Sequence, residues 1–205
     1  MATTTTNYGF DIPQSTDLVK DGATAIATLG QDIDTAMNTA LGTKKAGMVL
    51  LNTTSFSGVG SIALPLDTFS ATYKNYRLLF QITNSTNSTI TLRGRAAGVD
   101  KTTAAYNSAG YFAGVTSAVT RLNTTGATAI TLVTTTTTTV VGNMDLFDPN
   151  SAVVSGRGLF NYFNTAAGDA YNGHFTFAGT VLDSLNFIAS TGTISGRLQA
   201  FGYNE

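Results

Sequence analysis

The sequence predicts a mainly β protein, in which an N-terminal extended arm and a single α-helix precede an antiparallel, jelly-roll-like β-sandwich. Three observations support this prediction. One long stretch near the N-terminus has apolar residues at helical spacing, and short runs of β-forming residues follow it along the rest of the chain. The chain is also rich in threonine, whose β-branched side chain favours strands. We therefore expect two domains, an arm and helix over residues 1–46 and a sandwich over residues 47–205.

The first 14 residues are expected to form the extended arm. In this segment Tyr8, Phe10 and Ile12 alternate with polar residues or glycine, as they would along a strand. Pro13 prevents the helix from beginning earlier. Two roles remain open for Tyr8 and Phe10: they anchor the arm on a partner, or they staple it to the chain's own helix.

The long helix is predicted over residues 17–41. Ser15 or Thr16 is suited to cap its start, and Gly42 suits the position after its end. From Ile26 onward the apolar positions recur at steps of three and four, which is the narrow seam of a coiled coil. The seam consists of Val19, Ile26, Leu29, Ile33, Ala36 and Ala40.

This helix is expected to need a partner. Gly22 and Gly30 lie in its interior, and a helix with such residues is only marginally stable alone. The partner is the chain's own β domain, the identical helices of neighbouring subunits, or the surface of another protein. We expect self-association or docking, because the seam is narrow and small residues line it.

After Gly47 the chain is predicted to contain only strands and their connections, which indicates a sandwich or barrel. Alternation is clear in the run 76–84, where Tyr76, Leu78 and Phe80 fall on one face of a strand. The predicted strands cover residues 48–56, 61–66, 76–84, 88–96, 105–113, 127–134, 140–147, 156–164, 173–178, 184–189 and 193–203.

Three polar stretches between these runs need separate interpretation. Residues 97–103 and 122–127 are polar and contain glycine, so we expect them to be display loops. The threonine run 134–139 is flanked by apolar pairs, and we interpret it as a hairpin edge or a crossing between sheets.

Composition restricts the classes of function. Charged residues make up 11% of the chain and the net charge is −1, so there is no basic field and no nucleic-acid partner is expected. The absence of cysteine excludes disulfides and thiolate metal sites. The sequence contains neither an 18-residue apolar run nor the charged and apolar regions of a signal peptide, so no membrane association is expected.

Residues for catalysis are sparse, and we expect no enzyme, cofactor or metal site. His174 is the single histidine, and no nucleophile-elbow, metalloprotease, phosphate-loop or dinucleotide fingerprint accompanies it. Asp145 and Asp148 flank a predicted turn, where capping is the better interpretation than calcium binding. A group of aromatic residues would fill the core or a subunit contact, or would form a platform for sugars: Tyr106, Tyr111, Phe112, Tyr162 and Tyr171.

Several motifs lie along the chain. Near the N-terminus they are Asn7-Tyr8-Gly9-Phe10-Asp11-Ile12-Pro13, Thr16-Asp17-Leu18-Val19-Lys20-Asp21-Gly22 and Ala25-Ile26-x-x-Leu29-Gly30-x-x-Ile33-Asp34. In the β region they are Asp67-Thr68-Phe69-Ser70-Ala71-Thr72-Tyr73-x-Asn75-Tyr76-Arg77, Asp145-Leu146-Phe147-Asp148-Pro149, Ser190-Thr191-Gly192-Thr193-Ile194 and Phe201-Gly202-Tyr203. Together these motifs resemble virion appendage proteins of tailed bacteriophages, the tail-fibre, minor-tail and head-fibre components.

The resemblance implies a non-enzymatic structural protein of the virion that takes part in host attachment or capsid decoration. It implies a homotrimer that contacts capsid or tail proteins and displays its sandwich outward. On this interpretation the arm and helix mediate oligomerisation or attachment through Tyr8, Phe10, Val19, Ile26, Leu29 and Ile33.

Two other classes of function are kept as hypotheses. The first is a carbohydrate-binding adhesin whose sandwich loops recognise host surface glycans through aromatic stacking. The second is a hydrolase built around His174, for which the sequence offers no supporting motif.

Overall fold

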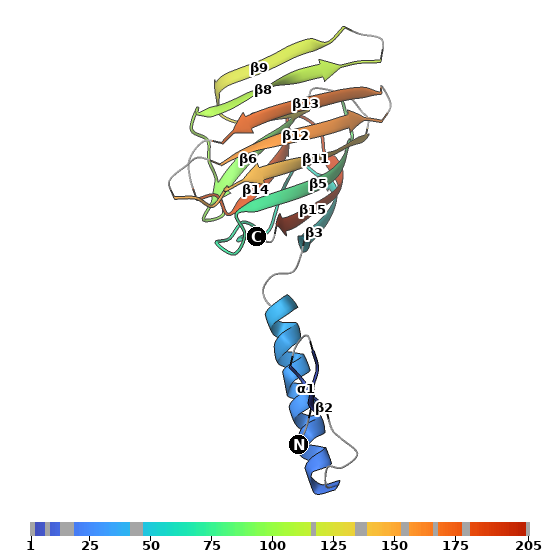
Figure 1. Ribbon diagram of the computed structural model, residues 1–205. Coiled ribbons are helices and arrows are strands. Elements are labelled where there is room, and N and C mark those ends of the chain that lie inside the picture. Colours follow the sequence, from blue (N-terminus) through green and yellow to red (C-terminus); the bar gives the residue numbers. More distant parts are fainter. Residues whose placement is uncertain are drawn as a thin grey trace. The chain divides into compact units, whose positions relative to one another are not determined.

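The computed structural model describes residues 3–6, 9–12, 19–41, 47–115, 118–133, 139–152, 156–165, 168–177 and 181–203 (Figure 1). The chain divides into two compact units. One contains Met1–Gly47, and the other contains Met48–Tyr203. Each unit is therefore described by itself.

The N-terminal unit consists of a small hairpin and one helix. Strands β1 (Thr3–Thr4) and β2 (Asp11–Ile12) pair antiparallel, and β2 lies against helix α1 (Val19–Leu41). The Thr5 N–H donates to the Phe10 carbonyl at 2.9 Å, and the Phe10 N–H donates to Thr5 Oγ1 at 2.9 Å. The segment expected to be an extended arm therefore doubles back beside the helix as a hairpin.

In its described residues the second unit contains 13 strands in two antiparallel sheets. The large sheet has the order β3-β15-β5-β11-β12-β13-β8-β9, and the small sheet has the order β10-β6-β14-β4 with β7 paired to β6. The strands are β3 (Met48–Val59), β4 (Ser61–Ala63), β5 (Asn75–Asn84), β6 (Ile90–Ala96), β7 (Val99–Asp100), β8 (Tyr106–Ala113), β9 (Thr120–Ala127), β10 (Ile130–Val133), β11 (Thr139–Phe147), β12 (Arg157–Asn164), β13 (Asp169–Thr176), β14 (Ser184–Ala189) and β15 (Ile194–Tyr203).

The two sheets pack as a sandwich with the strand order of a jelly roll, which confirms the predicted fold class. Four strands of each sheet give this order, β3-β15-β5-β11 in one sheet and β4-β14-β6-β10 in the other. Two hairpins, β8–β9 and β12–β13, are additions to this framework, and both extend the large sheet. With these hairpins the large sheet has eight described strands, and β7 brings the small sheet to five.

The alternation predicted for residues 76–84 is present in β5, where inward and outward side chains alternate. Tyr76, Leu78 and Phe80 face the small sheet and are buried in the core, while Arg77 and Gln81 face outward. The core continues across both sheets with aromatic and aliphatic side chains such as Phe69, Leu92, Tyr106, Met144, Phe160, Phe175, Leu185, Phe187 and Leu198.

One predicted loop is a strand, and the other contains a strand of two residues. Residues 122–127 belong to β9, and Val99–Asp100 within the stretch 97–103 form β7. Residues 120–126 of β9 are all exposed, so this edge strand has no buried face that an apolar pattern could reveal. Within the threonine run, residues 134–138 lie outside the described residues, and Thr139 begins β11.

Glycines on the inner face of the large sheet make room for aromatic rings. A Cβ atom added to Gly142 would lie 2.5 Å from Cζ of Phe80 and would also collide with the Asn161 carbonyl. A Cβ atom added to Gly158 would lie 2.6 Å from Cζ of Phe175. These glycines weaken strand propensity, but they allow large rings to lie close to the sheet.

We expect Gly142→Ala to destabilise the sandwich by about 1–2 kcal/mol. The overpacking penalty of about 1–3 kcal/mol exceeds the gain of about 0.4–1 kcal/mol from a less flexible unfolded chain. The free energy of unfolding in urea measures this difference. Gly60→Ala is the matched control, because an added Cβ would meet no atom within 4 Å there. Equal stability of the two variants would contradict the packing account.

Candidate functional site

The residues expected to mediate oligomerisation belong to the N-terminal unit. Phe10 is half-buried in the hairpin, and Leu29 is half-buried on α1. Ile26 and Ile33 are exposed on α1. Val19 begins the helix, but its side chain lies outside the described part of the chain, as does the whole of Tyr8.

One flank of α1 is partly covered. Its half-buried positions recur at steps of three and four, so at about 100° per residue they form one continuous stripe. These positions are Gly22, Ala25, Leu29, Asp32 and Ala36. Strand β2 is the described element that lies against the helix. The Leu29 side of the predicted seam is therefore the shielded side.

The adjoining flank of the helix is bare. Ile26 is 65% exposed, Ile33 is 40% exposed and Met37 is 54% exposed. At about 100° per residue these three side chains fall within roughly 40° of one another. The charged residues of the helix whose side chains are described, Asp21, Asp32 and Asp34, fall outside this flank. We call Ile26, Ile33 and Met37 the open stripe.

The open stripe is large relative to the unit that carries it. Fully burying one such side chain is worth about 1.5–3 kcal/mol. A unit of the size of Met1–Gly47 is smaller than the ~60 residues at which independent domains are already marginal. Covering the open stripe with a second apolar surface would therefore add substantially to the stability of this unit.

A polar cluster lies on the outer face of the large sheet. Arg77 Nε donates to Asp145 Oδ1 at 2.7 Å, and Arg77 Nη2 donates to Asp145 Oδ2 at 2.6 Å. The Tyr203 hydroxyl donates to Asp145 Oδ1 at 2.9 Å. The hydrogen bonds from Arg77 hold the pKa of Asp145 below its ordinary value. Asp145 thus links the last strand, β15, to β5 and β11.

The residues considered for metal or catalytic chemistry are separated in the structure. Asp145 is paired with Arg77, whereas Asp148 is exposed and lies just after β11. His174 is exposed on the outer face opposite Leu159, and it makes no hydrogen bond or ion pair with any described residue. Among the described residues, no group of three or more histidine, cysteine, aspartate or glutamate side chains could hold a metal ion.

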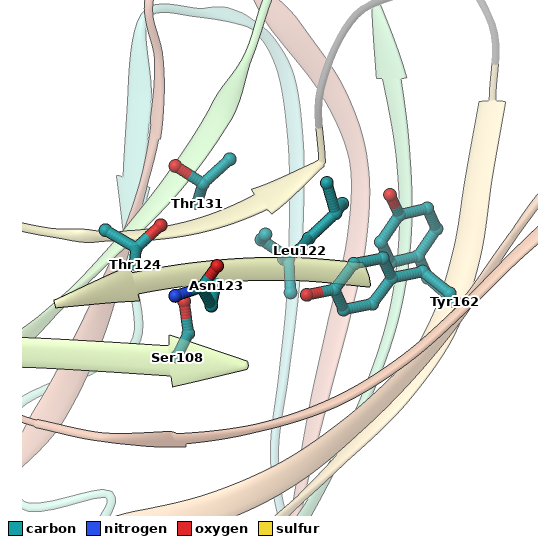
Figure 2. Close-up of a pocket in the computed structure, with 8 residues that line it drawn as sticks. Ser108, Leu122, Asn123, Thr124, Thr131 and Tyr162 are labelled. Carbon is teal, nitrogen blue, oxygen red and sulfur yellow. The ribbon is translucent and has the colours of Figure 1, made fainter. Parts of the chain in front are cut away.

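At least three hollows in the described part of the sandwich are lined by polar and aromatic side chains, and two of them are candidate binding sites. The first, of about 440 Å³, lies on the outer face of the large sheet, where Tyr111 and Arg121 approach Asn161, Asn172 and His174. The second, of about 170 Å³, lies on the inner side between β9 and β10 (Figure 2). It is lined by Ser108, Leu122, Asn123, Thr124, Thr131, Leu132, Tyr162 and Tyr171.

The aromatic residues considered as a sugar platform do not form one exposed surface. Tyr106, Tyr162 and Tyr171 are buried, and Phe112 is half-buried. Tyr111 alone among the five is exposed. Tyr162 and Tyr171 belong to the group of five aromatic residues identified in the sequence, but that these two are direct neighbours follows only from the register of β12 and β13.

The chain matches no protein-family model, and no curated protein or solved structure is significantly similar to it. In the described part of the chain, no helix combines the length and apolarity needed to cross a bilayer.

We expect the Asp145 cluster to make stability depend on acidic pH. A carboxyl group with a lowered pKa in the folded state contributes stability above its unfolded pKa of about 4 and loses it as pH falls through the folded pKa. Asp145→Asn should therefore reduce the free energy of unfolding at neutral pH and flatten its decline below about pH 4.

Urea unfolding at several pH values measures this effect. Asp148→Asn is the control, because its exposed side chain makes no ion pair with a described residue. A decline in stability with acid that is as steep in Asp145→Asn as in the parent chain would rule out this contribution.

Proposed function

We propose that the chain is a non-enzymatic structural protein of a tailed-phage virion, an oligomeric appendage attached by its N-terminal arm and helix and displaying its β-sandwich. The observation that carries the proposal is the uncharged open stripe of Ile26, Ile33 and Met37 on a small unit. The resemblance of the N-terminal and β-region motifs to virion appendage proteins supports the virion role. The jelly roll also suits this role, since viral capsid domains use it, although a fold alone does not define a function.

Self-association is supported by the partial covering of α1, which leaves the open stripe exposed. The hairpin shields the Leu29 flank, so each copy has one apolar flank left to pack against its neighbours. A helix with a single apolar flank suits a closed bundle, in which every copy buries the same residues. A trimer is the expected number of copies, because this is the usual arrangement of the appendages that the sequence resembles.

We expect Ile26→Asp/Ile33→Asp to convert the oligomer into a monomer. Two carboxylates would have to be buried in the bundle, and an unpaired buried charge costs far more than the contact provides. Sedimentation equilibrium should give about three times the chain mass of 21.3 kDa for the parent and a single chain mass for the variant. In the phage that encodes the chain, the variant should also be absent from purified particles.

Thr24→Asp/Gln31→Asp is the matched control, because it adds the same charge to exposed positions on the opposite side of α1. It should preserve both the mass and the incorporation into particles. A parent chain that remains monomeric at high concentration, or an Ile26→Asp/Ile33→Asp variant that still joins particles, would refute the proposal.

A carbohydrate-binding adhesin is the second candidate function. The observation in its favour is that both candidate hollows of the sandwich are lined by hydroxyl, amide and aromatic side chains, which are the groups that recognise sugars. These hollows are built on strands rather than on the loops that the sequence indicated.

A glycan array probed with the full chain separates the two candidates. Saturable binding to bacterial surface polysaccharides would favour the adhesin, because a purely structural appendage has no reason to recognise them. Absence of binding across the array, together with incorporation into particles, would favour the structural role alone.

A further inference from the structure

The inner hollow is lined by several polar groups that make no hydrogen bond with a described residue. It lies between β9 of the large sheet and β10 of the small sheet, and Figure 2 shows Ser108, Thr124 and Thr131 around one end of it. Leu122 and Tyr162 lie at the other end. Because the lining residues come from β8, β9, β10, β12 and β13, the hollow exists only once both added hairpins are in place.

Two tyrosines of this hollow are mostly buried, while their hydroxyl oxygens are not among the fully buried, unsatisfied atoms of the described residues and so are accessible from the hollow. Tyr162 is 6% exposed and Tyr171 is 5% exposed, and neither hydroxyl makes a hydrogen bond with a described residue. Both hydroxyls are therefore available to form hydrogen bonds with water or with a ligand in the hollow.

The two tyrosines are held rigidly. Their rings stack with centroids 5.3 Å apart and an interplanar angle of 4°, and Phe160 stacks on Tyr171 at 4.9 Å. A Cβ atom on Gly110 would lie 2.8 Å from the Tyr171 hydroxyl, so this glycine leaves the space that the hydroxyl occupies. Burial raises the pKa of both hydroxyls, so at neutral pH each one both donates and accepts.

The remaining lining has the same chemical character. The hydroxyls of Ser108, Thr124 and Thr131 and the amide of Asn123 also make no hydrogen bond with a described residue. No charged side chain lines the hollow, while Leu122 and Leu132 supply apolar surface. The volume of about 170 Å³ exceeds many times the 10–15 Å³ that one water requires.

We propose that the inner hollow binds one neutral sugar unit of hexose size. A pyranose carries hydroxyls that donate and accept around its rim, and it presents C–H groups on its faces. The six unpartnered polar side chains match the hydroxyls, and the leucines and tyrosine rings match the C–H faces. The absence of a charged lining residue favours a neutral sugar over an anionic one. This inference does not depend on the virion role.

The test uses the full chain with free glucose, galactose, mannose and N-acetylglucosamine as probes. Saturation-transfer NMR detects binding, and calorimetric titration gives the affinity. At least one sugar should bind saturably, and Tyr162→Phe and Tyr171→Phe should each weaken it tenfold or more. Thr131→Val should weaken it several-fold. The melting temperature of the phenylalanine variants should stay unchanged or rise, since the lost hydroxyls have no protein partner among the described residues.

Tyr111→Phe is the control, because it removes a hydroxyl from the opposite face of the same sheet. It should bind the sugar as the parent chain does. Absence of saturable binding by all four sugars would overturn the proposal, as would full affinity in Tyr162→Phe and Tyr171→Phe. Loss of affinity in Tyr111→Phe would also overturn it by placing the sugar in the outer hollow. The oligomer mass, measured on the same samples, tests the proposed virion role separately.

Discussion

The close fit between aromatic rings and glycines on the inner face of the large sheet is the constraint on which the sandwich depends. Phe80 packs over Gly142, and Phe175 packs over Gly158. Each ring of this size buries a large apolar area, about 150–250 Å² per aromatic side chain. The same fit is repeated at the margin of the core, where Gly110 makes room for Tyr171. Tyr171 also lines the inner hollow, so packing of a ring against a glycine occurs both in the core and beside that hollow.

The two added hairpins explain why the sandwich has features beyond a plain jelly roll. The framework of eight strands is complete without β8, β9, β12 and β13. These four strands widen the large sheet on one side only, and both hollows lie on them. Such additions can vary without disturbing the framework, which is the usual relation between a stable scaffold and a binding surface.

Much of the fold could be predicted from the sequence, but the pairing of distant segments and the exposed edge strands could not. The alternation of Tyr76, Leu78 and Phe80 was sufficient to predict β5, because one face of that strand is buried. Strand β9 was missed because it lies at a sheet edge with neither face covered. The hairpin of β1 and β2 was missed because only two residues pair on each side, too few to create a pattern. The role of the six seam residues stays a prediction, and the shielding of Leu29 depends on that hairpin. The inner hollow brings together residues as distant as Ser108 and Tyr171, and no local signal connects them.

The position of the last strand determines when this protein can finish folding. Strand β15 is not at an edge, since it pairs with β3 on one side and with β5 on the other. Its final residue, Tyr203, is paired with Met48, a separation of 203 − 48 = 155 residues. The sandwich therefore cannot close before β15 has emerged from the ribosome, and until then the edges of β3 and β5 that pair with β15 stay open. A chain with such distant pairings folds slowly and exposes those edges to aggregation during synthesis.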